Sequence, residues 1–134
     1  MRPNPRIPTR SVLVVDDDQD LLEEVSETLS DEGYLVMSAQ GVDAALEVLR
    51  NHADIQVIVT DILMPDKSGI SLIQESRAEF KRNLNYIIMS GHLNPATKSL
   101  RVDDDKISFL GKPLDIDQFL SSVERAFRRD NPGA

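Results

Sequence analysis

Ser11-Val-Leu-Val-Val-Asp-Asp-Asp18 is a short apolar run that ends in three consecutive carboxylates. A run of this length, rich in β-branched residues, is typical of a strand that is covered on both faces of a parallel sheet. Similar runs recur along the chain, and longer segments with a helical spacing of apolar residues separate them. The five predicted strands are Val12–Val15, Tyr34–Met37, Val57–Val59, Tyr86–Met89 and Ile107–Leu110.

Start and stop signals of helices support this alternation. Asp18 is a predicted N-cap, Gly33 follows the first helical segment as a C-cap, and Asn94-Pro95 is typical of a helix start before the fifth strand. Asp115 with Gln118 resembles a capping box before the last helix. Five β-then-α units predict an α/β protein with a three-layer doubly wound (βα)5 flavodoxin-like fold, whose parallel sheet has the strand order 2-1-3-4-5.

Length and composition narrow the class of protein. The 134 residues fit one domain, which we expect at residues 11–129, between a disordered N-terminal arm (1–10) and a flexible C-terminal tail (130–134). Cysteine is absent, so disulfides and thiolate chemistry are excluded. The net charge of −8 argues against direct nucleic-acid binding. No stretch of the arm is apolar enough for a signal peptide or a membrane span, so we expect a cytoplasmic protein.

Polar side chains follow four of the predicted strands. Asp16 and Asp17 come after the first strand, Asp61 after the third, Ser90 after the fourth and Lys112 after the fifth. Ligands of doubly wound sheets bind outside the carboxyl ends of the strands, and the first and third strands are neighbours in the predicted order. Their carboxylates should therefore converge, which is unfavourable unless a cation such as Mg²⁺ lies between them.

This arrangement suits phosphoryl transfer. A carboxylate beside Mg²⁺ can attack phosphorus, while a lysine ammonium and a hydroxyl contact the transferred oxygens; here these groups would be Asp61, Lys112 and Ser90. The acidic run could instead be no more than an N-cap with first-turn charges. We assign that role to Asp18 alone, because Asp16 and Asp17 directly end an apolar strand.

Five motifs in this order and spacing resemble the receiver domains of response regulators in two-component signalling, of the chemotaxis-type stand-alone class. The resemblance covers residues 12–127. The motifs are Asp16-Asp17, Asp61-Ile-Leu-Met-Pro65 with Gly69, Ser90-Gly91, the aromatic Phe109, and Lys112-Pro113.

The resemblance implies roles for individual residues. Asp16 and Asp17 would hold or orient Mg²⁺, Asp61 would ligate it and be phosphorylated, and the backbone carbonyl of Leu63 would complete the protein ligands. Lys112 and Ser90 would assist the transfer.

Other positions would have structural and switching roles. Gly69 and Pro113 would be structural, the bond before Pro113 being usually cis in this family. Phosphorylation would draw Ser90 inward and turn Phe109, which would switch the surface of the fourth helix, fifth strand and fifth helix. Phe109 could equally be a core residue.

The resemblance also implies partners. A sensor histidine kinase or a histidine phosphotransfer protein would be the donor, a downstream protein effector is possible, and no membrane is involved. The chain would be a phosphoacceptor with self-catalysed transfer and autodephosphorylation rather than a turnover enzyme, and a monomer or a phosphorylation-dependent dimer. The segment Arg101–Lys106 lacks the glycine that the family usually has there, so no dimer mode is carried over.

Other readings compete with this one. A haloacid-dehalogenase-like phosphatase would use Asp16-Asp17-Asp18 but would leave Asp61 and Lys112 less well explained. A degenerate receiver that acts only in protein interactions would not need all these site residues. The leading Met favours a stand-alone protein. The main alternative is a receiver cut from a larger DNA-binding regulator.

Overall fold

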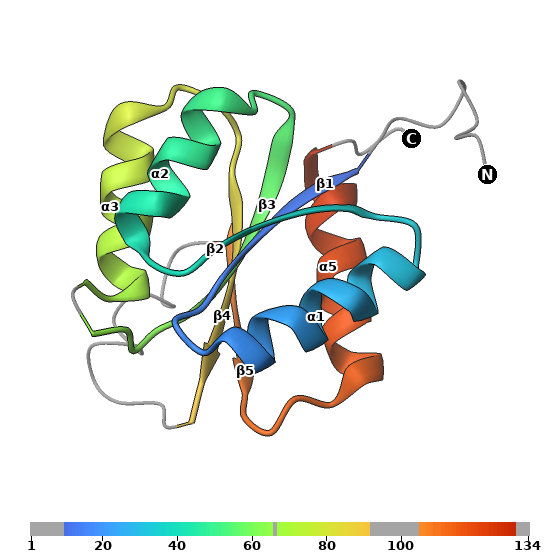
Figure 1. Cartoon of the computed structure of the whole chain (residues 1–134). Coiled ribbons are helices and arrows are strands. Elements are labelled where there is room, and N and C mark those ends of the chain that lie inside the picture. The colour runs from blue at the N-terminus through green and yellow to red at the C-terminus, as the bar shows by residue number, and fades with distance from the viewer. Residues whose placement is uncertain (1–9, 66, 92–104, 131–134) are drawn as a thin grey trace.

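The computed structural model describes residues 10–65, 67–91 and 105–130. In that part of the chain, five strands alternate with four helices (Figure 1). In chain order they are β1 (Ser11–Val15), α1 (Gln19–Asp31), β2 (Leu35–Ala39), α2 (Val42–Asn51), β3 (Ile55–Asp61), α3 (Gly69–Glu79), β4 (Asn85–Ser90), β5 (Ile107–Gly111) and α5 (Ile116–Asp130). The helix predicted to start at Asn94-Pro95 lies outside the described residues.

All strand pairs are parallel, and the order β2-β1-β3-β4-β5 is the predicted one. Helices α2 and α3 cover one face of the sheet, and α1 and α5 cover the other (Figure 1). The three-layer α/β fold class is therefore confirmed. Because every strand runs in the same direction, all carboxyl ends meet at one edge of the sheet.

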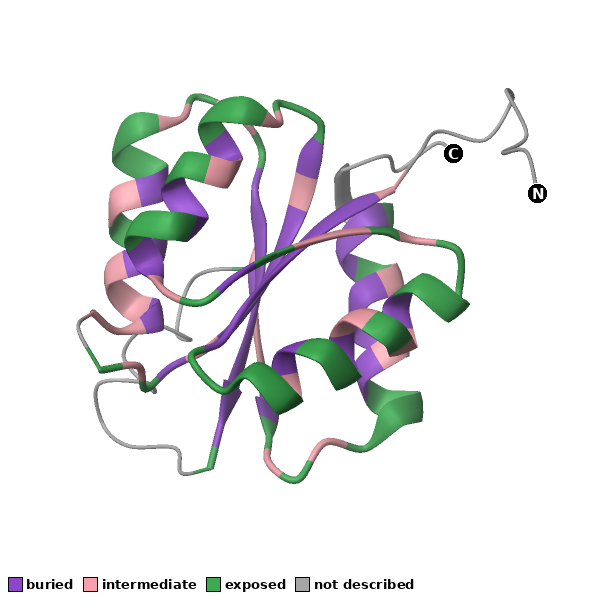
Figure 2. Cartoon of the chain, in the orientation of Figure 1, coloured by how far each residue is buried: buried purple, intermediate pink, exposed green. Residues whose placement is uncertain are grey.

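The alternation of side chains along the central strands builds two cores. In β1, Leu13 and Val15 pack on the α2 and α3 side, whereas Val12 and Val14 pack on the α1 and α5 side. All four are fully buried, and β1 and β4 are buried along their whole length, whereas the edge strand β2 is partly exposed (Figure 2). Apolar residues on both faces hold the sheet rigidly between the helices, so that the loops at its carboxyl edge have a fixed base.

Asp18 caps the start of α1 as predicted, whereas the C-cap is Glu32 and Gly33 is the residue that follows it. The Asp18 carboxylate accepts hydrogen bonds from the backbone N–H groups of Asp20 and Leu21. Gly33, with a φ of 94°, adopts the left-handed conformation that follows a helix end and that glycine tolerates best. Asp115 likewise accepts from the N–H of Gln118 at the start of α5.

Helix α3 ends at Glu79, directly before Phe80. Phe80 is the C-cap of α3 and has extended backbone dihedrals. Its ring lies under the Arg82 guanidinium, 4.9 Å from the centroid. Arg82 also donates to the carbonyls of Leu49 and His52, which end α2. Arg82 therefore joins the turn between α3 and β4 to the end of α2.

None of the helices in the described part of the chain has the length and hydrophobicity needed to cross a bilayer.

Candidate functional site

Three carboxylates converge at the carboxyl edge of the sheet. Asp16 and Asp17 follow β1, Asp61 ends β3, and one carboxylate oxygen of each lies within 4.8 Å of the others. The neighbouring positions of β1 and β3 bring them together, since Val15 pairs with Thr60 in the parallel ladder. The sequence-predicted convergence therefore has a direct basis in strand register.

Asp16 has the most unfavourable surroundings of the three carboxylates. Its residue is 1% exposed, Oδ1 accepts the backbone N–H of Asp18 at 2.9 Å, and Oδ2 is buried without a hydrogen-bond partner. Burial raises the pKa of Asp16, and the charges of Asp61 and Asp17 raise it further, although the Asp18 N–H and Lys112 act against them. The folded state thus binds this proton more tightly than the unfolded chain does. The stabilising effect of the proton is complete below the unfolded pKa and is lost as pH rises through the folded pKa.

A bound cation would offset the burial of Asp16 and its repulsion by the other two carboxylates. Carboxylate oxygens are the preferred ligands of hard divalent ions, and the buried Oδ2 of Asp16 is an acceptor that nothing in the described protein satisfies. Asp17 is exposed, so the cluster is open to solvent on one side. The acidic cluster could therefore bind a metal ion.

Lys112 contacts the Asp61 carboxylate. Its Nζ lies 2.7 Å from Oδ2 of Asp61, and their side chains are 29% and 13% exposed. The backbone N–H of Lys112 donates to the carbonyl of Ser90, which fixes the start of the β5–α5 loop at the end of β4. The Lys112–Pro113 bond is cis, as the resemblance implies.

The loop after Asp61 is tied to the sheet at its first residues. Ile62 is buried and donates its N–H to the carbonyl of Met89 in β4, and Leu63 donates its N–H to Oδ1 of Asp61. The two oxygens of the Asp61 carboxylate thus have different partners. The side chain of Leu63 is 73% exposed beside them.

Gly69 starts α3 directly against the end of β3. Its N–H donates to the carbonyl of Ile62. A Cβ at this position would lie 2.6 Å from the carbonyl oxygen of Asp61, nearer than real Cβ atoms come. Only glycine lets α3 approach the end of β3 this closely, which explains on steric grounds why the motif has glycine at position 69.

The two residues predicted to switch lie on β4 and β5. Ser90 is buried at the end of β4, next to Gly111 in the ladder. Phe109 is half-buried and packs against the core on the α2 and α3 side. Both lie at the site edge or close to it, while the segment between their strands is outside the described residues.

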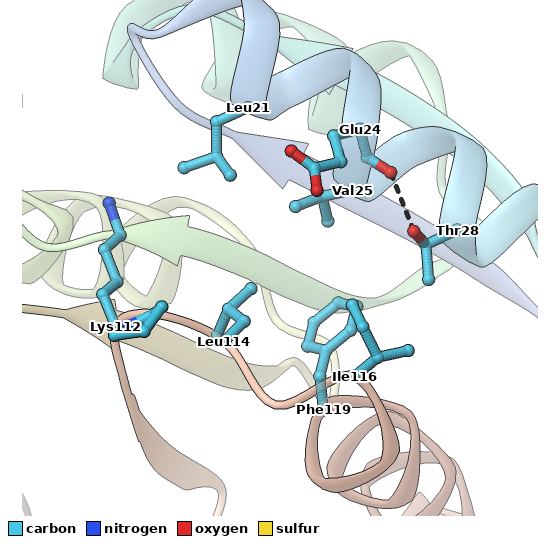
Figure 3. Close-up of a pocket in the computed structure, with 9 residues that line it drawn as sticks. Leu21, Glu24, Val25, Thr28, Lys112, Leu114, Ile116 and Phe119 are labelled. Carbon is cyan, nitrogen blue, oxygen red and sulfur yellow. Dashed lines mark hydrogen bonds between the residues drawn. The ribbon is translucent and has the colours of Figure 1, made fainter.

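An apolar pocket of about 250 Å³ flanks the site on the α1 side (Figure 3). The side chains of α1 form one wall, and those of the β5–α5 loop and the first turn of α5 form the other. Lys112 lines the pocket and also contacts Asp61, so the pocket adjoins the acidic cluster. The lining residues are Leu21, Glu24, Val25, Thr28, Lys112, Pro113, Leu114, Ile116 and Phe119.

Sequence reasoning missed Lys67. Its Nζ lies 3.0 Å from Asp43 at the start of α2 and 3.0 Å from Glu75 in α3. Asp43 precedes Lys67 by 24 positions and Glu75 follows it by eight, so no regular spacing in the sequence predicts these ion pairs.

The fold and this geometry agree with the comparisons. A family model described as the response regulator receiver domain matches residues 12–124. The chain belongs to the response regulator receiver domain family. The phosphatase alternative is thereby set aside, and the receiver motifs found in the sequence lie within the matched residues.

Similar proteins include longer regulators. The chain is 31% identical over 116 residues to the DNA-binding transcriptional regulator NtrC of Proteus hauseri, covering 87% of this chain and 24% of that protein. It is 28% identical over 123 residues to the transcriptional regulatory protein KdpE of Mycobacterium tuberculosis, covering 92% and 53%. The receiver thus spans about a quarter to a half of these relatives.

A solved structure gives a third comparison. The beryllofluoride-activated NtrC4 receiver domain dimer superimposes with a TM-score of 0.77 at 29% identity, covering 89% of this chain and 97% of that one.

Proposed function

We propose that this receiver accepts a phosphoryl group onto Asp61 in a Mg²⁺-dependent reaction. One observation carries the proposal: the Asp61 carboxylate lies within 4.8 Å of those of Asp16 and Asp17 and also accepts a hydrogen bond from the Lys112 ammonium. We propose residues 11–129 as the receiver domain, with short flanking segments and a cytoplasmic location.

The residues of the chain divide the work. Asp16, Asp17, Asp61 and the carbonyl of Leu63 would hold Mg²⁺, which supplies charge neutralisation on the phosphoryl oxygens. An oxygen of Asp61 forms the bond to phosphorus as the bond from phosphorus to the donor breaks, and the donor leaves with that electron pair. The Lys112 ammonium, already at the carboxylate, then pairs with a phosphoryl oxygen.

The later steps would complete a signalling cycle. Ser90 donates a hydrogen bond to another phosphoryl oxygen, and Phe109 turns toward the space that Ser90 leaves. These movements shift the conformational equilibrium of the surface formed by β5, α5 and the segment before β5. Water hydrolyses the acyl phosphate, so the protein is a phosphoacceptor rather than a turnover enzyme. Leu63 offers that water no hydrogen bond, which favours a long-lived phosphoryl group.

The function is tested by intact-mass analysis after incubation with acetyl phosphate. With Mg²⁺, one phosphoryl adduct is expected, and hydroxylamine should remove it because acyl phosphates are labile to this nucleophile. With EDTA in place of Mg²⁺, no adduct is expected, since the three carboxylates then repel the incoming anion. An adduct that forms equally well in EDTA would contradict the proposal.

The donor would be a sensor histidine kinase or a histidine phosphotransfer protein, and we propose that it binds at the pocket beside Lys112. Helix α1 contains five acidic residues and no basic one. The pocket itself is lined mainly by apolar side chains. A donor helix with an aliphatic side chain flanked by lysine or arginine complements both features, and binding there would bring its phosphohistidine to Asp61.

Ile116→Ser tests this surface. Ile116 lines the pocket and is 45% exposed, so the substitution should leave folding intact. Transfer from a kinase identified by phosphotransfer profiling should slow by about tenfold, as expected for the loss of an apolar anchor. The rate with acetyl phosphate should not change.

Leu35→Ser is the matched control, because Leu35 is 55% exposed on the edge strand β2 and does not line the pocket. Equal slowing by both variants, or none with Ile116→Ser, would rule out docking at the pocket.

The architecture of the whole protein is also a proposal. A stand-alone receiver, a monomer or a phosphorylation-dependent dimer, would signal to a protein effector. The alternative is a receiver that is part of a longer DNA-binding regulator. The NtrC relative is described as a DNA-binding transcriptional regulator, and the KdpE relative as a transcriptional regulatory protein. In neither case would the receiver itself bind nucleic acid.

A further inference from the structure

A cleft lies beside the described residues of the loop between β3 and α3. The cleft has a volume of about 310 Å³. Met64, Pro65 and Lys67 of the loop form one wall, and the start of α2 forms the other. Asp17 of the acidic cluster also lines it, so the cleft adjoins the carboxylates at the edge of the sheet.

The ends of this loop are held by backbone contacts close to the sheet. Ile62 is fixed to β4, and Gly69 donates its N–H back to Ile62. Between these points, Met64 packs partly against the core, while Pro65 is exposed. Of the described residues beyond Met64, Pro65 and Lys67 do not belong to the core cluster, so apolar packing does not hold them.

Lys67 joins the two walls of the cleft. Its ammonium lies 3.0 Å from Oδ1 of Asp43 in α2 and 3.0 Å from Oε1 of Glu75 in α3. These two bonds raise the pKa of Lys67, so the ammonium stays charged across the usual range of pH. One side chain thus connects the loop to both helices on this face of the sheet.

We propose that Lys67 is a positioning residue for metal binding: its paired contacts with Asp43 and Glu75 clamp the β3–α3 loop and so place the Leu63 carbonyl for the cation. This inference rests on the proposed function, since it assigns the loop a role at the Mg²⁺ site. The contribution to global stability is small, because ion pairs this exposed contribute little to folding. The effect should appear in loop order and metal affinity.

The direction of the change in Mg²⁺ affinity distinguishes a positioning role of Lys67 from a purely electrostatic one. A lysine near the acidic cluster repels Mg²⁺, so its removal should strengthen cation binding by Coulomb's law alone. Positioning requires the opposite result, weaker binding. Lys67→Met keeps an unbranched side chain that is one atom shorter, and it removes the charge and the two bonds.

The experiment measures MgCl₂ binding by isothermal titration calorimetry for wild type, Lys67→Met and Lys67→Arg. We expect the dissociation constant of Lys67→Met to rise about fivefold, the effect of losing two exposed ion pairs. Lys67→Arg, which can bridge the same carboxylates, should stay close to wild type. Lys81→Met removes an equal charge from an exposed lysine after α3 and should not weaken binding.

Hydrogen exchange of the metal-free protein gives a second readout. Amides of the loop peptide from Ile62 to Gly69 should exchange faster in Lys67→Met, while those of the strands stay unchanged. Unchanged or tighter Mg²⁺ binding by Lys67→Met, or unchanged exchange in the loop, would overturn the clamp. If wild type binds no Mg²⁺, the proposed function fails instead, and the exchange comparison still decides whether Lys67 orders the loop.

Discussion

Asp61→Asn is expected to abolish the phosphoryl adduct completely. The amide has nearly the shape of the carboxylate, but it lacks the anionic oxygen that attacks phosphorus. It also removes one of the three carboxylates of the acidic cluster and the ion pair with Lys112. Intact-mass analysis with acetyl phosphate and Mg²⁺ measures the loss, and peptide mapping of wild type should locate the adduct on Asp61.

Asp31→Asn is the matched control for this result. Asp31 is exposed at the end of α1, so this variant has the same change in charge but should be phosphorylated at the wild-type rate. Thermal unfolding should show that Asp61→Asn is folded. An adduct of equal yield on Asp61→Asn would mean that another residue accepts the phosphoryl group.

Gly69→Ala is expected to have the second largest effect. The new Cβ would lie 2.6 Å from the carbonyl oxygen of Asp61 and 3.2 Å from Cα of Ile62, and both are backbone atoms that cannot swing aside. Either α3 or the end of β3 must shift. Overpacking of this kind costs about 1–3 kcal/mol in the free energy of unfolding. Because the clash is with the backbone of Asp61 itself, phosphorylation by acetyl phosphate should fall strongly as well.

Gly41→Ala provides the comparison for this steric effect. Gly41 precedes α2 with an extended φ of 178°, and an added Cβ there would meet nothing within 4 Å. Denaturant unfolding should give Gly41→Ala nearly wild-type stability. If Gly69→Ala were equally stable and equally active, the close approach of α3 to Asp61 would be unimportant.

Most of the fold could be predicted because its signals are local. Apolar runs and helical spacing indicated every strand and the described helices, and the residues at the strand ends indicated one functional edge. Asp18 and Gly33 marked the limits of α1 by their side-chain and backbone preferences. These features depend on residues within a few positions of one another, which is the range that a sequence pattern reports.

The remaining features depend on contacts between distant segments. The bond from Lys67 to Asp43 joins residues 24 positions apart, and no periodicity predicts it. The steric need for Gly69 is visible only when α3 lies against β3. Asn85, at the start of β4, is fully buried and neither polar atom of its side chain has a hydrogen-bond partner. A hydrophobicity pattern would place a polar residue in such a position at the surface.

The contact between Arg10 and α5 has a practical consequence. The Arg10 guanidinium lies 5.6 Å from the centre of the Phe127 ring, which stacks on Tyr34. The first described residue and the final helix therefore meet at the amino ends of the strands, opposite the three carboxylates. A fluorescent protein or surface anchor attached beyond either point would leave Asp61 accessible. A circularly permuted chain could join these two points with a short linker and open elsewhere.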